Sequence, residues 1–295
     1  MAFDSMEEIF RRCDATGAPF WKVILDMDVD ERQVTPEESF EKMRGTWQAM
    51  LEADATYRSD RRSASGLVGG DGKRMRLYTA ENHTLSGGYM SEVITTALCM
   101  GESNACMRKI VAAPTAGACG VLPAVLIPLS WQDQLQEDTI VKALYVAAGI
   151  GAVVGLRACI SGASGGCQAE IGTASAMAAG ALTFLRGGDG RKIGNAAAMA
   201  LKNLMGLVCD PVAGLVEVPC VKRNVIGAVN AVSSADMALA GIESRVPVDQ
   251  VIDAMGSVGQ RLPVELRETA LGGLAATPFG QKVKEELESC RAAQM

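Results

Sequence analysis

Three cysteines lie at breaks in the sequence where the backbone is rich in glycine or proline. Cys167 lies in SGASGGCQAE, Cys209 in GLVCDPVAG and Cys220 in VEVPCVKRN. Irregular backbone of this kind can approach a ligand closely. Three thiolates converging from three turns could hold a metal centre and leave one coordination position open. Soft sulfur ligands favour zinc or an iron–sulfur cluster over magnesium or calcium.

The spacing of these cysteines leaves a second interpretation open. None of the nine cysteines forms a C-x-x-C pair, and a cysteine is often a small buried apolar residue with no ligand role. Cys209 and Cys220 are separated by ten residues that include two prolines, which predicts a stiff loop. On spacing alone, a metal site and simple core packing both explain the pattern.

The elements that would position these loops are helices. Alanine- and glycine-rich stretches alternate with glycine-rich breaks through the middle of the chain, and aromatic residues make up only 4% of the sequence. Such a composition is typical of closely packed helices rather than of a β-sandwich. The runs 139–157, 175–185, 195–207, 230–241, 248–258 and 278–291 are predicted to be helical. We therefore expect an all-α, single multi-helix domain over residues 1–295 with a buried Gly/Ala-rich centre.

The uneven distribution of charge predicts which helices lie on the outside. The first 50 residues carry 17 charged side chains, whereas residues 110 to 209 carry only 11. Residues 1–58 are accordingly predicted to be solvated helices packed on a core that the middle of the chain supplies. Ser5 with Glu8 and Thr35 with Glu38 both fit the capping box that begins a helix.

Composition also narrows the class of function and the compartment. The net charge of −6 argues against a nucleic-acid partner. An N-terminus without a basic start or an apolar segment does not resemble a secretory signal, so we expect a reducing, cytoplasmic location. Residues 110–132 contain no charge but three prolines, and the apolar run 143–156 is only 14 residues long. We interpret both as buried elements rather than membrane spans.

Three long segments resemble one known family. They are IVAAPTAGACGVLPAVL, SGASGGCQAEIGTASAMAAGA and MALKNLMGLVCDPVAGLVEVPCVKRN. Together they resemble the iron–sulfur-dependent L-serine dehydratases, in particular the alpha subunit of the two-chain form. The resemblance extends over residues 65–280. It implies an all-α catalytic domain with a [4Fe–4S] cluster held by Cys167, Cys209 and Cys220, and a reaction that converts L-serine to pyruvate and ammonium.

The resemblance also suggests which residues bind the substrate. The PTAG turn, with Thr115, Ala116 and Gly117, matches a family loop that is implied to contact substrate through hydroxyl and backbone N–H groups. A cluster with three thiolates carries a net negative charge, so cations should help to bind a substrate carboxylate. Candidates are Lys222 and Arg223, which follow Cys220 closely, and Lys73 in GGDGK.

The catalytic base is the part of the site that the sequence leaves undefined. His83, the only histidine, has a side chain suited to general-base catalysis, yet it lies outside the strongest motifs. In fused members of the family, histidine-bearing loops of a β part complete the active site, which implies a beta subunit as partner here. Some fused relatives place a C-terminal cysteine on the open iron, and Cys290 departs from that arrangement.

Two other functions remain as alternatives. A related cluster-dependent eliminase acting on L-cysteine or L-threonine would use the same residues with a different pocket volume. A metal-stabilised structural protein without catalysis would need a fourth protein ligand near the three cysteines, and no such residue is evident from the sequence.

Overall fold

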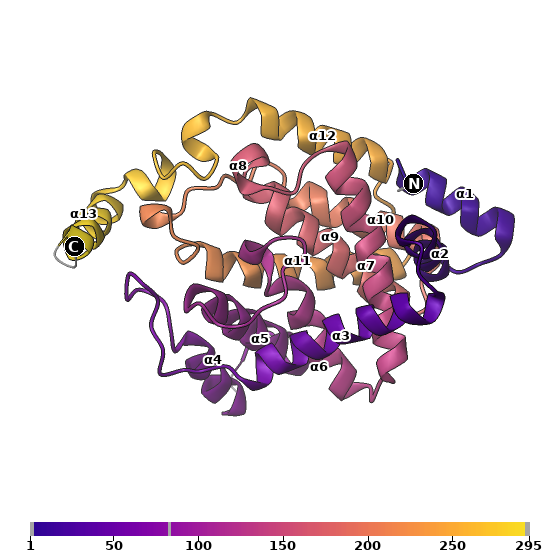
Figure 1. Ribbon diagram of the computed structural model, residues 1–295, viewed down its shortest axis with the longest axis horizontal. Coiled ribbons are helices and arrows are strands. Elements are labelled where there is room, and N and C mark those ends of the chain that lie inside the picture. The colour runs from indigo at the N-terminus through magenta and orange to yellow at the C-terminus, as the bar shows by residue number, and fades with distance from the viewer. Residues whose placement is uncertain (1–2, 82–83, 293–295) are drawn as a thin grey trace.

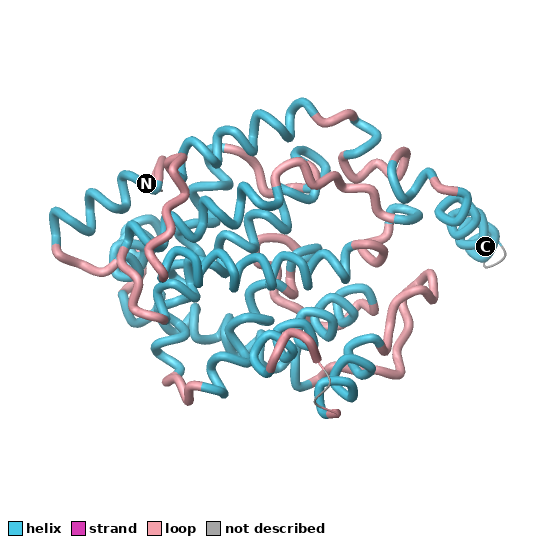
Figure 2. The backbone as a smooth tube through the Cα atoms, turned by 180° about the vertical axis from the view of Figure 1, so that it is seen from behind, coloured by secondary structure: helices cyan, strands magenta, loops and turns pink. Residues whose placement is uncertain are grey.

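The computed structural model describes residues 3–81 and 84–292, and within these ranges the regular structure is entirely helical (Figures 1 and 2). The only extended pairing in these ranges is an isolated bridge between Cys209 and Arg267. The expectation of an all-α fold is therefore confirmed. It follows from a sequence that is rich in alanine and glycine and poor in alternating β-branched residues.

The N-terminal helices and those that follow them cover one flank of the molecule. Their bounds are α1 (Met6–Thr16), α2 (Phe20–Arg32), α3 (Pro36–Ala55), α4 (Asp71–Ala80) and α5 (Gly88–Ala105). Helix α3 begins with the capping box expected from the sequence: the Thr35 hydroxyl accepts from the N–H of Glu38, and the Glu38 carboxylate accepts from the N–H of Thr35. Ser5 caps α1 as expected, but the Glu8 carboxylate accepts from the N–H of Asp4 instead.

The central helices form the core and lead into the cysteine loops. Their bounds are α6 (Val121–Gln132), α7 (Glu137–Arg157), α8 (Gly162–Gly165), the π-helical turn η2 (Gln168–Gly172), α9 (Thr173–Leu185), α10 (Gly190–Leu204) and α11 (Cys220–Leu239). Helix α9 contacts α6, α7, α10 and α11 and is buried from its first residue to Thr183. Its side chains are mostly those of alanine, glycine, serine and threonine, which allow neighbouring helix axes to approach closely.

The C-terminal part lies across the top and left of the view in Figure 1. It contains α12 (Val248–Arg261), the short turns η4 (Val264–Leu266) and η5 (Gly273–Ala276), and α13 (Pro278–Ala292). Helix α12 packs on α10, whereas α13 contacts η5 and the turn η3 (Val212–Gly214) and projects from the bundle. The chain between α12 and α13 runs beside the loop that carries Cys209.

Helix α7 is long and apolar enough to cross a membrane by length and composition alone. Here 61% of its apolar window is buried inside the protein, where it packs against α2, α3 and α9. We interpret its hydropathy as that of a core helix in a bundle whose centre is poor in charge.

A substitution at Gly227 would test how tightly the helices around the centre are packed. A methyl group at Gly227 of α11 would lie 2.9 Å from methyl carbons of both Ile171 and Val121. Because these β-branched side chains are stiff, we expect Gly227→Ala to lower the free energy of unfolding by about 1–3 kcal/mol. Urea denaturation of the purified protein would measure the change.

The matched control is Gly45→Ala in α3, where a methyl group would meet no atom within 4 Å. This change should leave stability unchanged or raise it by about 0.5–1 kcal/mol, because alanine favours a helix over glycine. Equal effects of the two substitutions would contradict the close packing of α11 on α6 and η2.

Candidate metal centre

Cys167 joins α8 to the π-helical turn η2 and is 2% exposed. The neighbouring residue, Gln168, holds it in place through both backbone and side chain. The N–H of Gln168 donates to the carbonyl of Leu207 at 3.0 Å, and its side-chain oxygen accepts from the N–H of Gly206 at 2.7 Å. These bonds bring the segment after α10, which leads directly to Cys209, against the cysteine of the preceding turn.

Cys209 is also 2% exposed and is fixed by the segment between α12 and α13. Its N–H donates to the carbonyl of Leu266 at 2.8 Å, and its carbonyl accepts from the N–H of Glu268 at 2.7 Å. The next residue, Asp210, accepts from the N–H of Leu274 at 2.8 Å. The Cys209 loop therefore depends on a partner segment nearly sixty positions later in the chain.

Cys220 is the first residue of α11, and the buried side chain of Asn224 connects it to the PTAG turn. The Asn224 amide donates to the carbonyls of Cys220 at 3.0 Å and Gly117 at 2.8 Å. Its oxygen accepts from the N–H of Gly120 at 2.8 Å. One buried amide thus holds the predicted substrate loop beside a predicted metal ligand.

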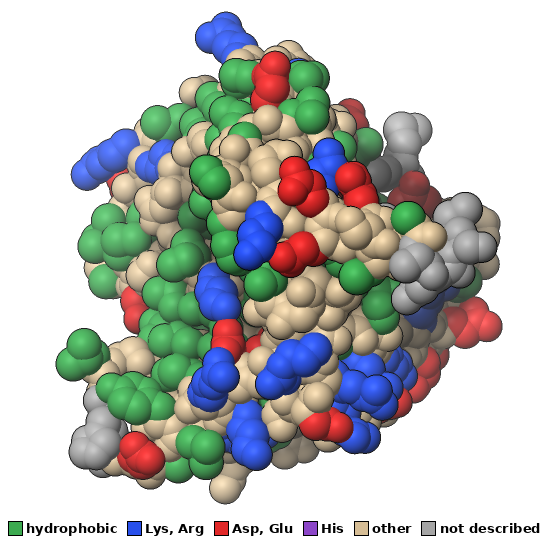
Figure 3. Space-filling model, turned by 90° about the vertical axis from the view of Figure 1, so that its left-hand side faces the viewer, with side chains coloured by type: hydrophobic (Ala, Val, Ile, Leu, Met, Phe, Trp, Pro, Cys, Tyr) green, Lys and Arg blue, Asp and Glu red, His purple; other side chains and the backbone are tan. Residues whose placement is uncertain are grey.

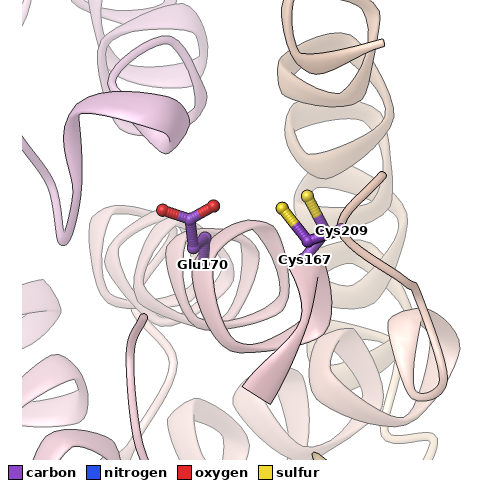
Figure 4. Close-up of side chains that lie close together, drawn as sticks. All are labelled: Cys167, Glu170 and Cys209. Carbon is purple, nitrogen blue, oxygen red and sulfur yellow. The ribbon is translucent and has the colours of Figure 1, made fainter. Parts of the chain in front are cut away.

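The thiols of Cys167 and Cys209 and a carboxylate oxygen of Glu170 lie within 4.8 Å of one another. Figure 4 shows Cys167 and Glu170 on one helical segment, Cys209 on a neighbouring loop, and all three side chains directed to the same side. Cys220 lies outside this close group. A single metal ion would draw all its sulfur ligands to within about 4 Å of one another, so the wider spacing suits a centre of several ions.

Gly162 leaves the space that this arrangement needs. A methyl group at its position would lie 2.9 Å from Oε2 of Glu170, 3.0 Å from Oε2 of Glu268 and 3.1 Å from Sγ of Cys209. Two carboxylates and a thiol from three separate segments therefore converge on the face of one glycine. Only a residue without a side chain permits this approach.

Arg223 supplies positive charge to the thiols. Its guanidinium donates to the carbonyl of Val208 at 2.8 Å and to the carboxylate of Asp210 at 2.7 Å. A hydrogen bond from Cys209 and the charge of Arg223 lower the pKa of the Cys167 thiol. The same hydrogen bond, with burial, raises the pKa of Cys209.

The pKa of the Cys220 thiol is shifted by burial and by the charges of the other residues at this centre. Burial, together with the negative charge at Cys167, raises the pKa of the Cys220 thiol to about 12. Carboxylates at Glu170 and Glu268 act in the same direction. The Cys220 thiol is therefore near enough to Cys167 and the two glutamates to respond to their charge, and a bound metal would be needed to hold all three cysteines as thiolates.

Glu170 faces the predicted substrate loop. Burial raises the pKa of its carboxyl, the nearby Thr115 hydroxyl lowers it, and Glu268 raises it further. The Thr115 hydroxyl is buried and makes no hydrogen bond of normal geometry among the described residues. A methyl group at Gly117 would lie 3.3 Å from both Glu170 oxygens. The structure thus brings Thr115 and Gly117 to the cysteines, with exposed Ala116 between them.

The predicted cations are placed differently from one another. Arg223 lies at the thiols, with a side chain 13% exposed. Lys222 is exposed and pairs with Asp71 at 2.7 Å, and Lys73 lines a separate pocket of about 290 Å³. Of the three, the structure brings only Arg223 to the cysteines.

Two further residues were singled out from the sequence. One lies away from this centre, and the other lies outside the residues that the structure describes. Cys290 is exposed on α13. His83 lies outside the described residues, so its proposed role as a base stays a prediction from the sequence.

The glycine-rich loop before α4 binds carboxylates of the protein itself. The N–H groups of Asp71 and Gly72 donate to the buried carboxylate of Glu102 at 2.6 and 3.2 Å. Earlier in the loop, the hydroxyls of Ser63 and Ser65 donate to the buried carboxylate of Glu217, which lies between Cys209 and Cys220. The carboxylate of Glu102, from α5, thus satisfies the first two backbone donors of α4.

Sequence reasoning did not single out Glu170, Glu268, Asp210 or Asn224. Glu170 lies within the quoted CQAE segment, and its position three residues after Cys167 was the available signal, because such a spacing puts two side chains on one helical face. Glu268 approaches through a left-handed backbone conformation, with φ of 61°, and no local pattern marks it.

Two buried cysteines and a carboxylate in one close group, with a third buried cysteine at the start of α11, define a candidate metal-dependent enzyme on an all-helical scaffold. Residues 15–275 match the family described as "Serine dehydratase alpha chain", and the chain belongs to that family. It is 44% identical over 265 residues to "Probable L-serine dehydratase, alpha chain" of Bacillus subtilis, which covers 90% of this chain and 88% of the relative.

Two further relatives show how the family is organised. "L-serine dehydratase, alpha chain" of Peptoniphilus asaccharolyticus is 39% identical over 285 residues, covering 96% of this chain and 97% of the relative. "L-serine dehydratase TdcG" of Escherichia coli is 45% identical over 181 residues, but that match covers only 40% of the relative and 61% of this chain. Some relatives therefore have much additional sequence beside the shared region.

The close approach at Gly162 gives a direct test of the centre. If the centre binds the iron–sulfur cluster that the sequence resemblance implies, we expect Gly162→Ala to displace the two carboxylates and the Cys209 thiol, and so to reduce the iron bound after anaerobic reconstitution severalfold. The control is Gly155→Ala in α7, where the nearest atom to a new methyl group would be 3.9 Å away. Iron and sulfide per chain would be measured for both. Full iron content in Gly162→Ala would show that the convergence on this glycine is not needed.

Proposed function

We propose that this protein is an L-serine ammonia-lyase that works with a [4Fe–4S] cluster held by Cys167, Cys209 and Cys220. The observation that carries the proposal is the placement of the three buried cysteines: Cys167 and Cys209 lie in one close group with Glu170, and Cys220 is joined to the PTAG turn through Asn224. The activity is that named for the family's relatives, and the substrate, L-serine, is the one in their names.

The residues present fit such a cluster. Thiolates are the ligands that iron–sulfur clusters use, and two of these thiols lie close together while Cys220 lies farther off. Arg223 offsets part of the thiolate charge. Gly162 has no side chain and so lets Glu170, Glu268 and the Cys209 thiol approach one another beside its backbone.

Serine dehydration must remove the α-proton and the β-hydroxyl, to give aminoacrylate that tautomerises and hydrolyses to pyruvate and ammonium. The cluster, when bound, supplies a Lewis-acidic iron without a protein thiolate, which would favour departure of the hydroxyl. The protein's own residues orient the substrate. Thr115 places a buried hydroxyl beside the Glu170 carboxylate, and Asn224 holds the carbonyl of Gly117 so that the turn keeps its position.

We propose that a beta subunit completes the active site. Relatives that match this chain over 88% and 97% of their own length are named alpha chains, a name that implies a second chain. The C-terminal segment next to Cys209 carries four exposed large apolar side chains, Val264, Leu271, Leu274 and Phe279. The face that includes this end of the molecule has a band of hydrophobic side chains down the left of the view, with Lys and Arg gathered beside it in the lower centre and right (Figure 3), which suits a docking surface.

We also assign the protein to the cytoplasm. All nine cysteines are free thiols, and a cluster with an open iron is stable only where oxidants are scarce. A reducing compartment meets both requirements.

A structural metal site is the second candidate, and one observation favours it. Glu170 lies close enough to Cys167 and Cys209 to act as a fourth protein ligand, which would close the coordination of a zinc ion. Metal analysis of the anaerobically purified protein separates the two candidates. Iron with sulfide, and a spectrum that L-serine changes, supports the enzyme; zinc alone, with no response to L-serine, supports the structural role.

If the three cysteines are the cluster ligands, replacing any one of them should have the same effect on cluster content and activity. Cys167→Ser, Cys209→Ser and Cys220→Ser should each remove the cluster and abolish pyruvate formation from L-serine, because a hydroxyl replaces thiolate poorly at iron. Iron, sulfide and pyruvate would be measured under anaerobic conditions. A normal iron content in one of these variants would exclude that residue from the ligand set.

Cys119→Ser is the control for these variants. This thiol is buried, but it lies near the carbonyl of Met100 rather than at the centre. The substitution should retain iron and activity at a cost of about 1–3 kcal/mol in stability.

The partner assignment predicts that this chain alone is a poor catalyst. The isolated protein should bind a cluster yet convert L-serine at least ~100-fold more slowly than with a beta subunit, the size of a missing general-base contribution. Pyruvate formation with and without the partner chain would measure the difference. Full activity from the single chain would contradict the requirement and make His83→Ala the next variant to assay.

A further inference from the structure

Two carboxylates at the metal centre have no basic partner. Glu170 and Glu268 are both partly buried and converge on Gly162, where one methyl group would meet an oxygen of each within about 3 Å. None of the ion pairs formed by the described residues includes either glutamate. Each carboxylate raises the cost of ionising the other.

The nearby cation is already committed elsewhere. Arg223 pairs with Asp210 at 2.7 Å and donates to the carbonyl of Val208, and its charge acts on Cys167 rather than on Glu170. A cluster with three thiolates would add further negative charge. The space between Glu170, Glu268 and Thr115 is therefore one in which a positively charged ligand group is stabilised.

We infer that Glu170, assisted by Glu268, binds the α-ammonium group of the amino-acid substrate. This inference rests on the function proposed above. An amino acid whose hydroxyl and carboxylate face the metal must still place its ammonium group against the protein. Glu170 lies at both the cysteines and the PTAG turn, and it is a carboxylate that lacks a cation.

The consequence is selectivity for amino acids. A substrate that carries the hydroxyl and carboxylate of serine but no ammonium group would leave the two carboxylates unneutralised. The enzyme should therefore discriminate against 3-hydroxypropanoate, which differs from serine by the loss of the amino group. A charge-assisted hydrogen bond of this kind corresponds to about 10- to 100-fold in binding.

The test is a binding cycle on the anaerobically reconstituted protein. L-serine and 3-hydroxypropanoate would each be titrated while the spectrum of the bound cluster is recorded, for the wild type and for Glu170→Gln. We expect Glu170→Gln to weaken L-serine by about 10- to 100-fold and to change 3-hydroxypropanoate by less than about threefold. The control is Glu265→Gln, an exposed glutamate on the same segment as Glu268, which should change neither.

Other results would overturn the inference. Equal weakening of both ligands would mean that Glu170 only shapes the centre. Unchanged L-serine binding with a lower kcat in the presence of the beta subunit would assign Glu170 to proton transfer. Should Glu170→Gln lose its iron, Glu268→Gln is titrated instead; loss of iron from both variants would make these glutamates metal ligands.

The wild-type control separates this inference from the proposed function. A wild-type protein that binds no iron, or whose spectrum does not respond to L-serine, contradicts the proposed function itself. A wild-type protein that responds to L-serine, with a Glu170→Gln variant that responds equally well, contradicts only the role of Glu170.

Discussion

The buried ion pair between Arg223 and Asp210 is the interaction on which the centre depends. Its two side chains are 13% and 6% exposed, and each makes further bonds, Arg223 to the carbonyl of Val208 and Asp210 to the N–H of Leu274. A buried pair of charges is tolerated when such additional hydrogen bonds satisfy it. It joins the start of α11, the Cys209 loop and the C-terminal segment, so three segments remote in sequence share one set of contacts.

Around this pair, segments of irregular backbone are buried, and their polar groups have hydrogen-bond partners within the protein. Loops usually lie at the surface because their polar groups need partners. Here Gln168 and Asn224, both 1% exposed, supply those partners to the segments beside Cys167 and Cys220. Neighbouring helices and the segment between α12 and α13 then hold the loops in place.

The sequence was sufficient to predict the helical fold. The three cysteines that it singled out are all buried, and their role as ligands stays a prediction, but the residues around them could not be predicted. Composition and periodicity predict helices because they are local properties, as the capping box at Thr35 shows. The roles of neighbouring cations were harder to assign from proximity in sequence. Arg223 is three residues after Cys220 and shares its helical face, whereas Lys222 is two residues after it and points elsewhere. Glu268 reaches the site through a long-range loop contact that no local pattern encodes.

The π-helical turn η2 gives the site an unusual dependence on chain length. This turn, Gln168–Gly172, lies between Cys167 and the fully buried α9, and a π-turn contains one residue more than an α-helical turn would. If that residue were removed and an α-helix restored, the short segment before it, which carries Cys167, would rotate by about 100° relative to α9. The register of the core would survive while Cys167 turned away from Cys209. The length of this segment is therefore as important to the site as the side chains of Gln168 and Glu170 that it carries.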